Sequence, residues 1–184
     1  MPGTSSPVVF TGPMATGKTA VGRSLAARRR LDFVDTDRRI TQRHGPIPAI
    51  FEAEGEDGFR RLEADVVREV LAGEGPGVVV SLGGGAVLDA GTRALLKAAR
   101  VVFLDADLAT VLPRLNAGAS RPMLAGDAGE RWATLYEQRR PLYLEVADCV
   151  IDTRGRTVRQ VVDDVERMLG LNDSTERRTT GHGT

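Results

Sequence analysis

The chain carries the stretch Gly12-Pro13-Met14-Ala15-Thr16-Gly17-Lys18-Thr19, which has the form G-x-x-x-x-G-K-[ST]. This stretch directly follows the apolar run Val8-Val9-Phe10 and precedes a segment with helical periodicity. A strand, this loop and a helix in succession are typical of a phosphate-binding loop, because backbone N–H groups and the helix N-terminus then converge on an anion. The loop therefore predicts a nucleotide-binding α/β fold.

Two side chains of the loop have the chemistry that phosphate binding needs. Lys18 brings a charge to the β and γ phosphates, and Thr19 offers a hydroxyl to Mg²⁺. The alternative is a chance glycine turn, since the chain has 21 glycines. The lysine content argues against chance, because the chain has only Lys18 and Lys97 and one of them falls where the motif requires it.

Length and composition indicate one folded domain. A chain of 184 residues holds one domain with a full core, and 41% hydrophobic with 27% charged residues excludes the disordered and membrane classes. No apolar run approaches the roughly 18 residues of a membrane span, and residues 1–6 lack the features of a secretory signal. We expect a single domain over residues 1–171, a disordered tail over 172–184 and a cytoplasmic location.

Charge and side-chain chemistry narrow the partners. Twenty-five acidic residues balance twenty-five basic ones, so a nucleic-acid or membrane partner is not expected, and a small anionic ligand is. A monomer is expected. Cys149 is the only cysteine and lies in an apolar run, which predicts a buried, inert thiol. His44 and His182 have no partner at metal-ligand spacing and are expected at the surface.

Short β-branched runs alternate with helix-length segments. Strands are expected at 7–10, 33–35, 78–82, 101–104 and 149–151, and helices at 18–29, 37–43, 47–54, 56–71, 91–98, 108–115, 130–146 and 158–169. This alternation predicts a three-layer α/β/α fold with a five-stranded parallel sheet. Ligands of such sheets bind at the carboxyl ends of the strands. The residues at these ends are Gly12, Asp35, Gly83, Asp105 and Asp152.

The stretch Asp35-Thr36-Asp37 ends the second expected strand with two carboxylates. One can serve a metal ion while the other orients an attacking hydroxyl and accepts its proton, two roles that phosphoryl transfer requires. The alternative is that both aspartates begin the next helix, with Thr36 or Asp37 as its N-cap. Their position after a phosphate-binding loop favours catalysis.

The helix expected from Glu56 places Arg60 and Glu63 three residues apart, as neighbours beside its apolar stripe. A guanidinium held in this way can clamp a substrate carboxylate with two hydrogen bonds. Taken alone, however, the pair is more typical of an ordinary surface ion pair.

Three consecutive glycines, Gly83-Gly84-Gly85, follow the third expected strand. They remove every side chain at the ligand-binding edge, so we expect a ligand to approach this backbone closely. The alternative is a flexible turn into the next helix, for which one or two glycines would suffice.

The segment 117–129 is rich in Gly and Ala and contains Arg121-Pro122, which predicts a mobile loop that acts as a lid. Arg121 and Arg139 are the remaining cationic candidates. Composition cannot select them, because arginines are frequent throughout the chain.

Taken together, these motifs resemble the shikimate kinase family. The stretches that carry the resemblance are Gly12 to Thr19, Asp35-Thr36-Asp37, Phe59-Arg60-Arg61-Leu62-Glu63, Leu82-Gly83-Gly84-Gly85-Ala86, Arg121-Pro122-Met123-Leu124 and Glu137-Gln138-Arg139-Arg140-Pro141-Leu142-Tyr143. Their order matches from about residue 8 to residue 169. The resemblance implies the fold of the nucleoside-monophosphate kinases, with a substrate-binding segment at about 35–63 and a lid at 117–129.

The resemblance also implies an activity, the ATP-dependent phosphorylation of the 3-hydroxyl of shikimate in aromatic amino-acid biosynthesis. Shikimate is expected at Asp37, Arg60, Gly83, Gly84, Gly85 and Arg139. ATP is expected at Ala15, Thr16, Gly17, Lys18, Thr19, Ala20, Arg114, Arg121 and Arg156, with Arg114 and Arg156 near the adenine. Mg²⁺ is expected at Thr19 and Asp35, and catalysis is assigned to Lys18, Asp37 and Arg121.

The chain departs from the family pattern in two places. Ala15 stands where the family usually has glycine, and a positive φ there would cost about 1 kcal/mol. Pro46 and Pro48 begin the substrate-binding helix and can alter its entry angle. Nucleotide affinity and acceptor preference depend on these departures.

Two other functions remain as alternatives. The first is a kinase of another polyhydroxylated acid such as gluconate, because Arg60, Arg139 and Asp37 alone do not distinguish a cyclohexene acid from a sugar acid. The second is a non-catalytic nucleotide-binding module. Intact Lys18, Asp37, Arg121 and Arg139 argue against that module.

Overall fold

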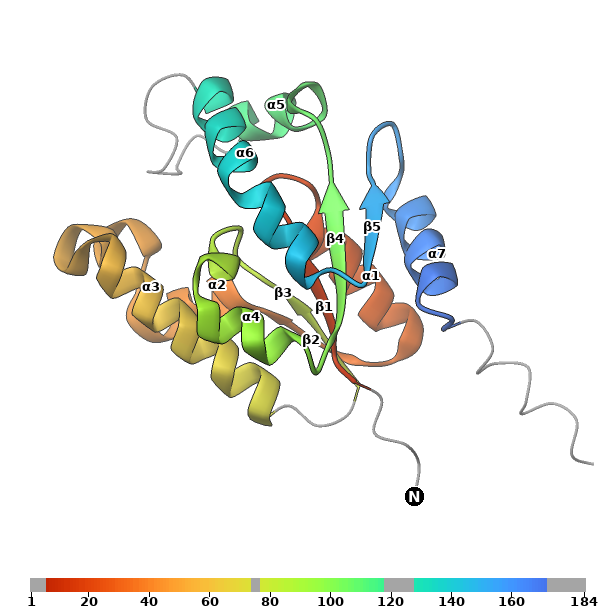
Figure 1. Cartoon of the computed structure of the whole chain (residues 1–184), viewed down its shortest axis with the longest axis horizontal. Coiled ribbons are helices and arrows are strands. Elements are labelled where there is room, and N and C mark those ends of the chain that lie inside the picture. The colour runs from red at the N-terminus through yellow and green to blue at the C-terminus, as the bar shows by residue number, and fades with distance from the viewer. Residues whose placement is uncertain (1–5, 74–76, 118–127, 172–184) are drawn as a thin grey trace, which may run out of the picture.

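The computed structural model describes residues 6–73, 77–117 and 128–171 of the chain. Within these ranges the chain forms a five-stranded parallel sheet in the order β2-β3-β1-β4-β5, with helices on both faces (Figure 1). The strands are β1 (Val8–Thr11), β2 (Asp32–Asp35), β3 (Val78–Ser81), β4 (Arg100–Asp105) and β5 (Cys149–Asp152). The helices are α1 (Lys18–Arg29), α2 (Thr36–His44), α3 (Ile47–Gly73), the 3₁₀ turn η1 (Ala86–Leu88), α4 (Ala90–Leu96), α5 (Leu108–Ala117), α6 (Ala128–Val146) and α7 (Val158–Met168).

The central strand β1 contributes side chains to a separate hydrophobic cluster on each face of the sheet, because successive side chains of a strand point to opposite faces. Phe10 packs into a cluster with Leu25 of α1 and Val165 of α7. Val9 packs into a second cluster with Val67 of α3. All five of these side chains are fully buried. The sheet is therefore covered on both faces, as parallel sheets require.

The structure confirms the predicted fold class and all five strands, whose ends move by one residue at most. The helices expected at 47–54 and 56–71 are both present within α3, where Gly55 separates them with a non-helical φ of 69° and ψ of −174°. The short turn η1 was not predicted. Ala117 still belongs to α5 and Ala128 begins α6, so the described ends of the expected lid are helical. Residues 118–127, including Arg121, lie outside the described residues.

Other expectations from composition can also be checked. Cys149 is buried at the start of β5, and burial raises the pKa of its thiol, as expected for an inert residue. His44 is exposed at the end of α2, whereas His182 lies outside the described residues. Within the described ranges, no helix combines the length and apolar character needed to cross a bilayer.

The parallel order brings the carboxyl ends of all the strands to one edge of the sheet. There β1 leads into the phosphate loop, β2 into α2, and β3 into the glycines that precede η1 (Figure 1). This edge is where the sequence predicts the site.

Candidate active site

A cavity of about 940 Å³ lies at this edge of the sheet. It extends from the phosphate loop across the ends of β2 and β3 to the start of α3. The cavity brings together the following predicted site residues: Ala15, Thr16, Gly17, Lys18, Thr19, Ala20, Asp35, Asp37, Arg60, Gly83, Gly84, Gly85, Arg114, Arg139 and Arg156. A loop built for anions and a cluster of charged side chains therefore share one space.

The phosphate loop is closed by its own lysine. Lys18 is buried, and its Nζ donates hydrogen bonds to the carbonyl oxygens of Gly12 at 2.8 Å and Pro13 at 2.7 Å. The Oγ1 of Thr16 donates to the carbonyl of Pro13 at 3.0 Å. Gly12 needs its positive φ of 131°, and a Cβ there would lie 2.5 Å from the carbonyl oxygen of Leu104. The loop thus depends on glycine where it passes β4.

Ala15 adopts a left-handed conformation with φ of 66°, which costs an alanine about 1 kcal/mol. The carbonyl groups on both sides of this residue are bonded to helices outside the loop. The carbonyl of Ala15 accepts from Nη1 of Arg114 in α5 at 2.8 Å, and that of Met14 accepts from Nε1 of Trp132 in α6 at 3.1 Å. Arg114, expected near the adenine, thus lines the cavity with its guanidinium on the phosphate loop.

The two residues expected to hold the metal are in direct contact. The Oγ1 of Thr19 donates to Oδ2 of Asp35 at 2.6 Å. A hydroxyl beside a carboxylate fits Mg²⁺, which prefers oxygen ligands and keeps several waters. In the described part of the chain, no three His, Cys, Asp or Glu side chains gather at a metal-binding distance. The Thr19 and Asp35 oxygens would therefore share the ion with water and phosphate.

The N-cap of α2 is Asp35, whose Oδ1 accepts from the backbone N–H of Arg38 at 3.1 Å. The sequence-based alternative named Thr36 or Asp37 as the cap, and this was wrong. The Oγ1 of Thr36 instead donates to the carbonyl of Ser81 at 3.3 Å and accepts from the N–H of Gly83 at 3.1 Å. Thr36 thus joins the ends of β2 and β3. Asp37 consequently lies beside the glycine turn.

Arg60 and Glu63 do not form the surface ion pair that the sequence alone favoured. Nη1 of Arg60 donates to Oε2 of Glu63 at 2.6 Å, and the Glu63 side chain is only 3% exposed. Burial raises the pKa of Glu63, the nearby charge of Arg60 opposes that rise, and Asp37 adds to it. Nη2 of Arg60 reaches Glu56 at 3.3 Å. The buried Nε of Arg60 has no hydrogen-bond partner among the described residues.

The glycine turn makes room for charged side chains of the site. A Cβ on Gly83 would lie 2.5 Å from Oδ1 of Asp37 and 2.6 Å from Oε1 of Glu63. A Cβ on Gly85 would overlap the guanidinium of Arg60. A Cβ on Gly84 would lie 3.4 Å from the nearest atom, which is an ordinary van der Waals distance. The outer two glycines therefore allow the carboxylates and the guanidinium to converge.

Tyr143 supports this turn from α6, and the sequence analysis missed it. Its hydroxyl donates to the carbonyl of Gly84 at 2.5 Å, and its ring packs against that of Phe103 of β4 at a tilt of 36°. Burial raises the pKa of Tyr143 to about 12, so the hydroxyl stays a donor. Tyr143 follows the buried Arg139 by four residues, the spacing that places two side chains on one helix face. This spacing is a signal that could have identified it.

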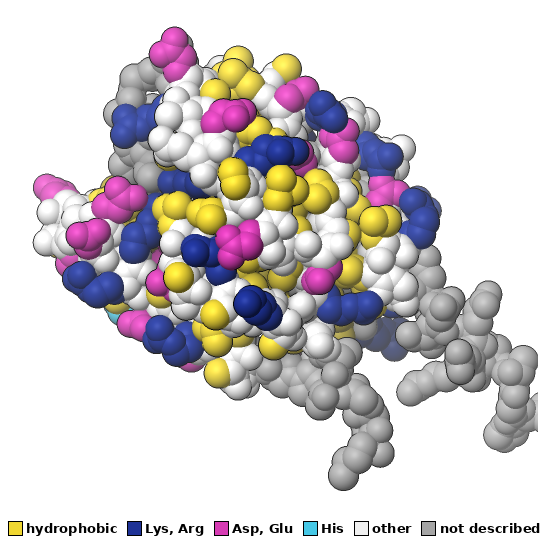
Figure 2. Space-filling model, in the orientation of Figure 1, with side chains coloured by type: hydrophobic (Ala, Val, Ile, Leu, Met, Phe, Trp, Pro, Cys, Tyr) yellow, Lys and Arg dark blue, Asp and Glu magenta, His cyan; other side chains and the backbone are white. Residues whose placement is uncertain are grey.

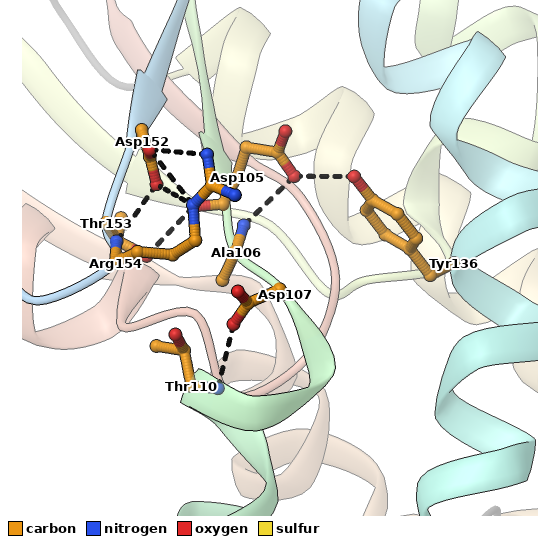
Figure 3. Close-up of polar contacts among 8 residues, drawn as sticks. All are labelled: Asp105, Ala106, Asp107, Thr110, Tyr136, Asp152, Thr153 and Arg154. Atoms are coloured by element: carbon orange, nitrogen blue, oxygen red, sulfur yellow. Dashed lines mark hydrogen bonds and ion pairs between the residues drawn. The ribbon is translucent and has the colours of Figure 1, made fainter.

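A second network fixes the loop after β5 (Figure 3). The backbone carbonyl of Asp105 accepts from both the N–H and the Oγ1 of Thr153 at 2.9 Å, while its Oδ1 accepts from the hydroxyl of Tyr136 at 2.7 Å. Arg154 forms an ion pair with Asp152 at 2.7 Å, which holds the pKa of Asp152 below its usual range. The network holds Thr153 at the wall of the cavity.

The chain matches the model of one protein family over most of its length. The shikimate kinase family model matches residues 14–169. The chain belongs to the shikimate kinase family.

Relatives within the shikimate kinase family agree over most of their length. The chain is 46% identical to the shikimate kinase of Streptomyces coelicolor over 155 residues, which cover 84% of this chain and 90% of that protein. It is 39% identical to the shikimate kinase of Francisella philomiragia over 165 residues, covering 88% and 93% of the two chains.

Solved structures extend the likeness to three dimensions. The shikimate kinase of Acinetobacter baumannii in complex with shikimate superposes with a TM-score of 0.86 at 35% identity, covering 92% of this chain and 96% of that one. A gluconokinase from Sinorhizobium meliloti has a TM-score of 0.64 at 21% identity and covers 91% and 93% of the two chains. The likeness to the gluconokinase shows a shared fold alone.

Proposed function

We propose that this protein transfers the γ-phosphoryl group of ATP to the 3-hydroxyl of shikimate, giving 3-phosphoshikimate and ADP. The observation that carries the proposal is the guanidinium of Arg60, oriented by buried Glu63 in the same cavity as the phosphate loop. Membership of the shikimate kinase family and the shikimate complex of the Acinetobacter baumannii relative support it.

Arg60 and Arg139 bind the carboxylate of shikimate. Both side chains line the cavity, Arg139 is 5% exposed, and Nε of Arg60 has no hydrogen-bond partner among the described residues. An anion recovers the cost of burying two cations, and the planar guanidinium matches a carboxylate with paired hydrogen bonds. The backbone of Gly83 to Gly85 faces the hydroxyl groups of the ring.

Asp37 orients the 3-hydroxyl and accepts its proton. The hydroxyl oxygen then forms a bond to the γ phosphorus as the bond to the β–γ bridging oxygen breaks, and ADP leaves. Oδ1 of Asp37 lies at the Gly83 turn, which follows β3 next to β1 and its phosphate loop. The acceptor and the phosphates therefore meet at neighbouring strand ends.

ATP is bound by Lys18, by the backbone N–H groups of residues 15–20 and by the guanidinium groups of Arg114 and Arg156. Thr19 and Asp35 hold Mg²⁺, which neutralises charge on the β and γ oxygens when it is bound. Arg121, which lies outside the described residues, adds a further cation to the phosphates. In this proposal the protein is a monomer that acts in the cytoplasm without a nucleic-acid or membrane partner.

An assay of acceptor-dependent ADP release tests the function. We expect kcat/KM for shikimate to exceed that for gluconate by about 10²-fold or more, because hydrogen-bonded sites reject acids whose hydroxyls fit poorly. Equal rates with gluconate would indicate a sugar-acid kinase. Tight ADP binding without turnover of either acid would indicate a non-catalytic module.

A further inference from the structure

The peptide group that joins Met14 to Ala15 in the phosphate loop is oriented by a hydrogen bond to its carbonyl group. Its carbonyl accepts a hydrogen bond from the indole Nε1 of Trp132 at 3.1 Å. The described part of the chain has no cis peptide bond, and in a trans peptide the C=O and N–H point in opposite directions. The N–H of Ala15 therefore points away from Trp132.

Trp132 holds this carbonyl from inside the protein. The indole is 3% exposed and packs in a cluster with Val111 and Leu115 of α5, against which Met14 and Ala15 lie. Trp132 does not line the cavity, whereas Met14 and Ala15 do. The carbonyl of Met14 thus faces the core of the protein, and the N–H of Ala15 is left to the side where phosphate binds.

The conformation of Ala15 makes this hold necessary. A flip of the Met14–Ala15 peptide would turn the φ of Ala15 from 66° to a negative value, the sign that alanine prefers. The same flip would aim the carbonyl of Met14 at the phosphate oxygens and withdraw an N–H donor from them. A glycine at position 15 would have little preference between the two states, but an alanine prefers the flipped one.

We infer that Trp132 is a positioning residue for nucleotide binding, whose indole N–H keeps the Met14–Ala15 peptide in the phosphate-binding orientation. The inference rests on the proposed function, because it assumes that the loop binds the phosphates of ATP and ADP. A side chain of α6 then fixes the orientation of a peptide group in the phosphate loop through a direct hydrogen bond. It also accounts for an alanine at a left-handed position of that loop.

Trp132→Phe is the first test, since phenylalanine keeps an aromatic ring beside Tyr136, whose ring lies 5.0 Å away at 8°, while it removes the indole N–H together with part of the ring volume. We expect the dissociation constant for ADP and the KM for ATP to rise about fivefold, the worth of one neutral hydrogen bond, with the KM for shikimate within about twofold of wild type. Thr134→Ala is the control on the same helix, because it removes an exposed hydrogen bond from the Thr134 hydroxyl to the carbonyl of Glu130 and does not touch the cavity. It should leave ADP affinity unchanged.

A rescue experiment separates positioning from general damage. In an Ala15→Gly background the flipped peptide is no longer favoured, so Trp132→Phe should weaken ADP binding by less than about twofold. The same fivefold loss in both backgrounds, or unchanged ADP affinity in Trp132→Phe, would overturn the inference. Failure of the wild-type protein to bind ADP would instead count against the proposed function.

The wild-type protein offers a further test if Trp132→Phe does not fold. Trp132 is the only tryptophan of the chain, so its indole N–H gives one resonance whose hydrogen exchange can be followed. Because ADP selects the unflipped peptide, ADP should slow this exchange, whereas saturating shikimate should not. Equal slowing by the two ligands, or none by ADP, would contradict a hold specific to the nucleotide.

Discussion

The Nη1 of Arg60 lies 2.6 Å from Oε2 of Glu63, in a pair whose carboxylate is almost fully buried. Ionised Glu63 offers only acceptors and a full negative charge to the guanidinium, whereas protonation removes the charge and adds a donor, so the orientation of Arg60 depends on the charge of Glu63. Burial raises the pKa of Glu63 above its ordinary value of 4.5, despite the opposing charge of Arg60. Acid should therefore loosen the substrate clamp at a higher pH than an exposed glutamate would allow.

We predict that the KM for shikimate rises as the pH falls through the raised pKa of Glu63, while the KM for ATP changes little. Glu63→Gln should raise the KM for shikimate and remove this acid limb. The folded protein holds this proton more tightly than the unfolded chain, so the Glu63 contribution to stability falls as the pH rises between 4.5 and the folded pKa. Steady-state kinetics from pH 5 to pH 8 test the prediction, and a wild-type limb that persists in Glu63→Gln would assign it to another group.

The clamp also depends on the shape of the cations. Arg60→Lys and Arg139→Lys keep the charge but lose the planar fork, so each should weaken shikimate binding by about tenfold and leave ADP binding within about twofold. Calorimetric titrations with shikimate and with ADP separate the two effects. Arg68→Lys is the control, because Arg68 is exposed on the same helix, α3. Unchanged shikimate affinity in both clamp variants would contradict the assigned role.

The glycine turn can be tested one residue at a time. A Cβ at position 85 would overlap the guanidinium of Arg60, so Gly85→Ala should displace that side chain and raise the KM for shikimate by about tenfold or more. Gly84→Ala adds the same methyl group where the nearest atom is 3.4 Å away and should be tolerated. Kinetics of both variants, with melting temperatures, test this. Equal defects would mean that the turn needs glycine for its backbone alone.

Much of this arrangement follows from the sequence because it depends on local rules. Buried β-branched runs and the Gly12 to Thr19 motif fix the strands and the phosphate loop, and the parallel order then brings Asp35 and Gly83 to one edge. The burial of Glu63 could not be predicted. It depends on how α3 packs against the end of β3, which spacing along one helix does not reveal.

The contacts made from α6 show the same limit. Trp132 donates a hydrogen bond to a backbone carbonyl of the phosphate loop, and Tyr143 donates one to a backbone carbonyl of the glycine turn. Both side chains are far from these segments in sequence. A carbonyl acceptor has no sequence signature, so a pattern of side chains cannot identify its donor. Sequence reasoning assigned a cost to a positive φ at Ala15 but did not predict that φ is positive there, and the only hint was that the family usually has glycine at this position.

Asp35 and Asp37 are expected to separate by function. Asp37→Asn keeps the shape but loses the carboxylate that orients the hydroxyl and accepts its proton. Its kcat should fall by about 10²-fold or more with nucleotide binding nearly unchanged. Asp35→Asn should instead raise the Mg²⁺ concentration for half-maximal rate, because its Oδ2 contacts the hydroxyl of Thr19 at the expected metal position.

A titration of Mg²⁺ against initial rate distinguishes the two aspartates. High Mg²⁺ should partly restore Asp35→Asn, because mass action refills a weakened site, and should not restore Asp37→Asn, because no ion replaces a missing proton acceptor. Asp35 also caps α2, so the melting temperature of Asp35→Asn must be followed, although asparagine is itself a good N-cap. Rescue of Asp37→Asn by Mg²⁺ would reverse the assignments. A defect of Asp35→Asn that is independent of Mg²⁺, at an unchanged melting temperature, would remove Asp35 from the metal site.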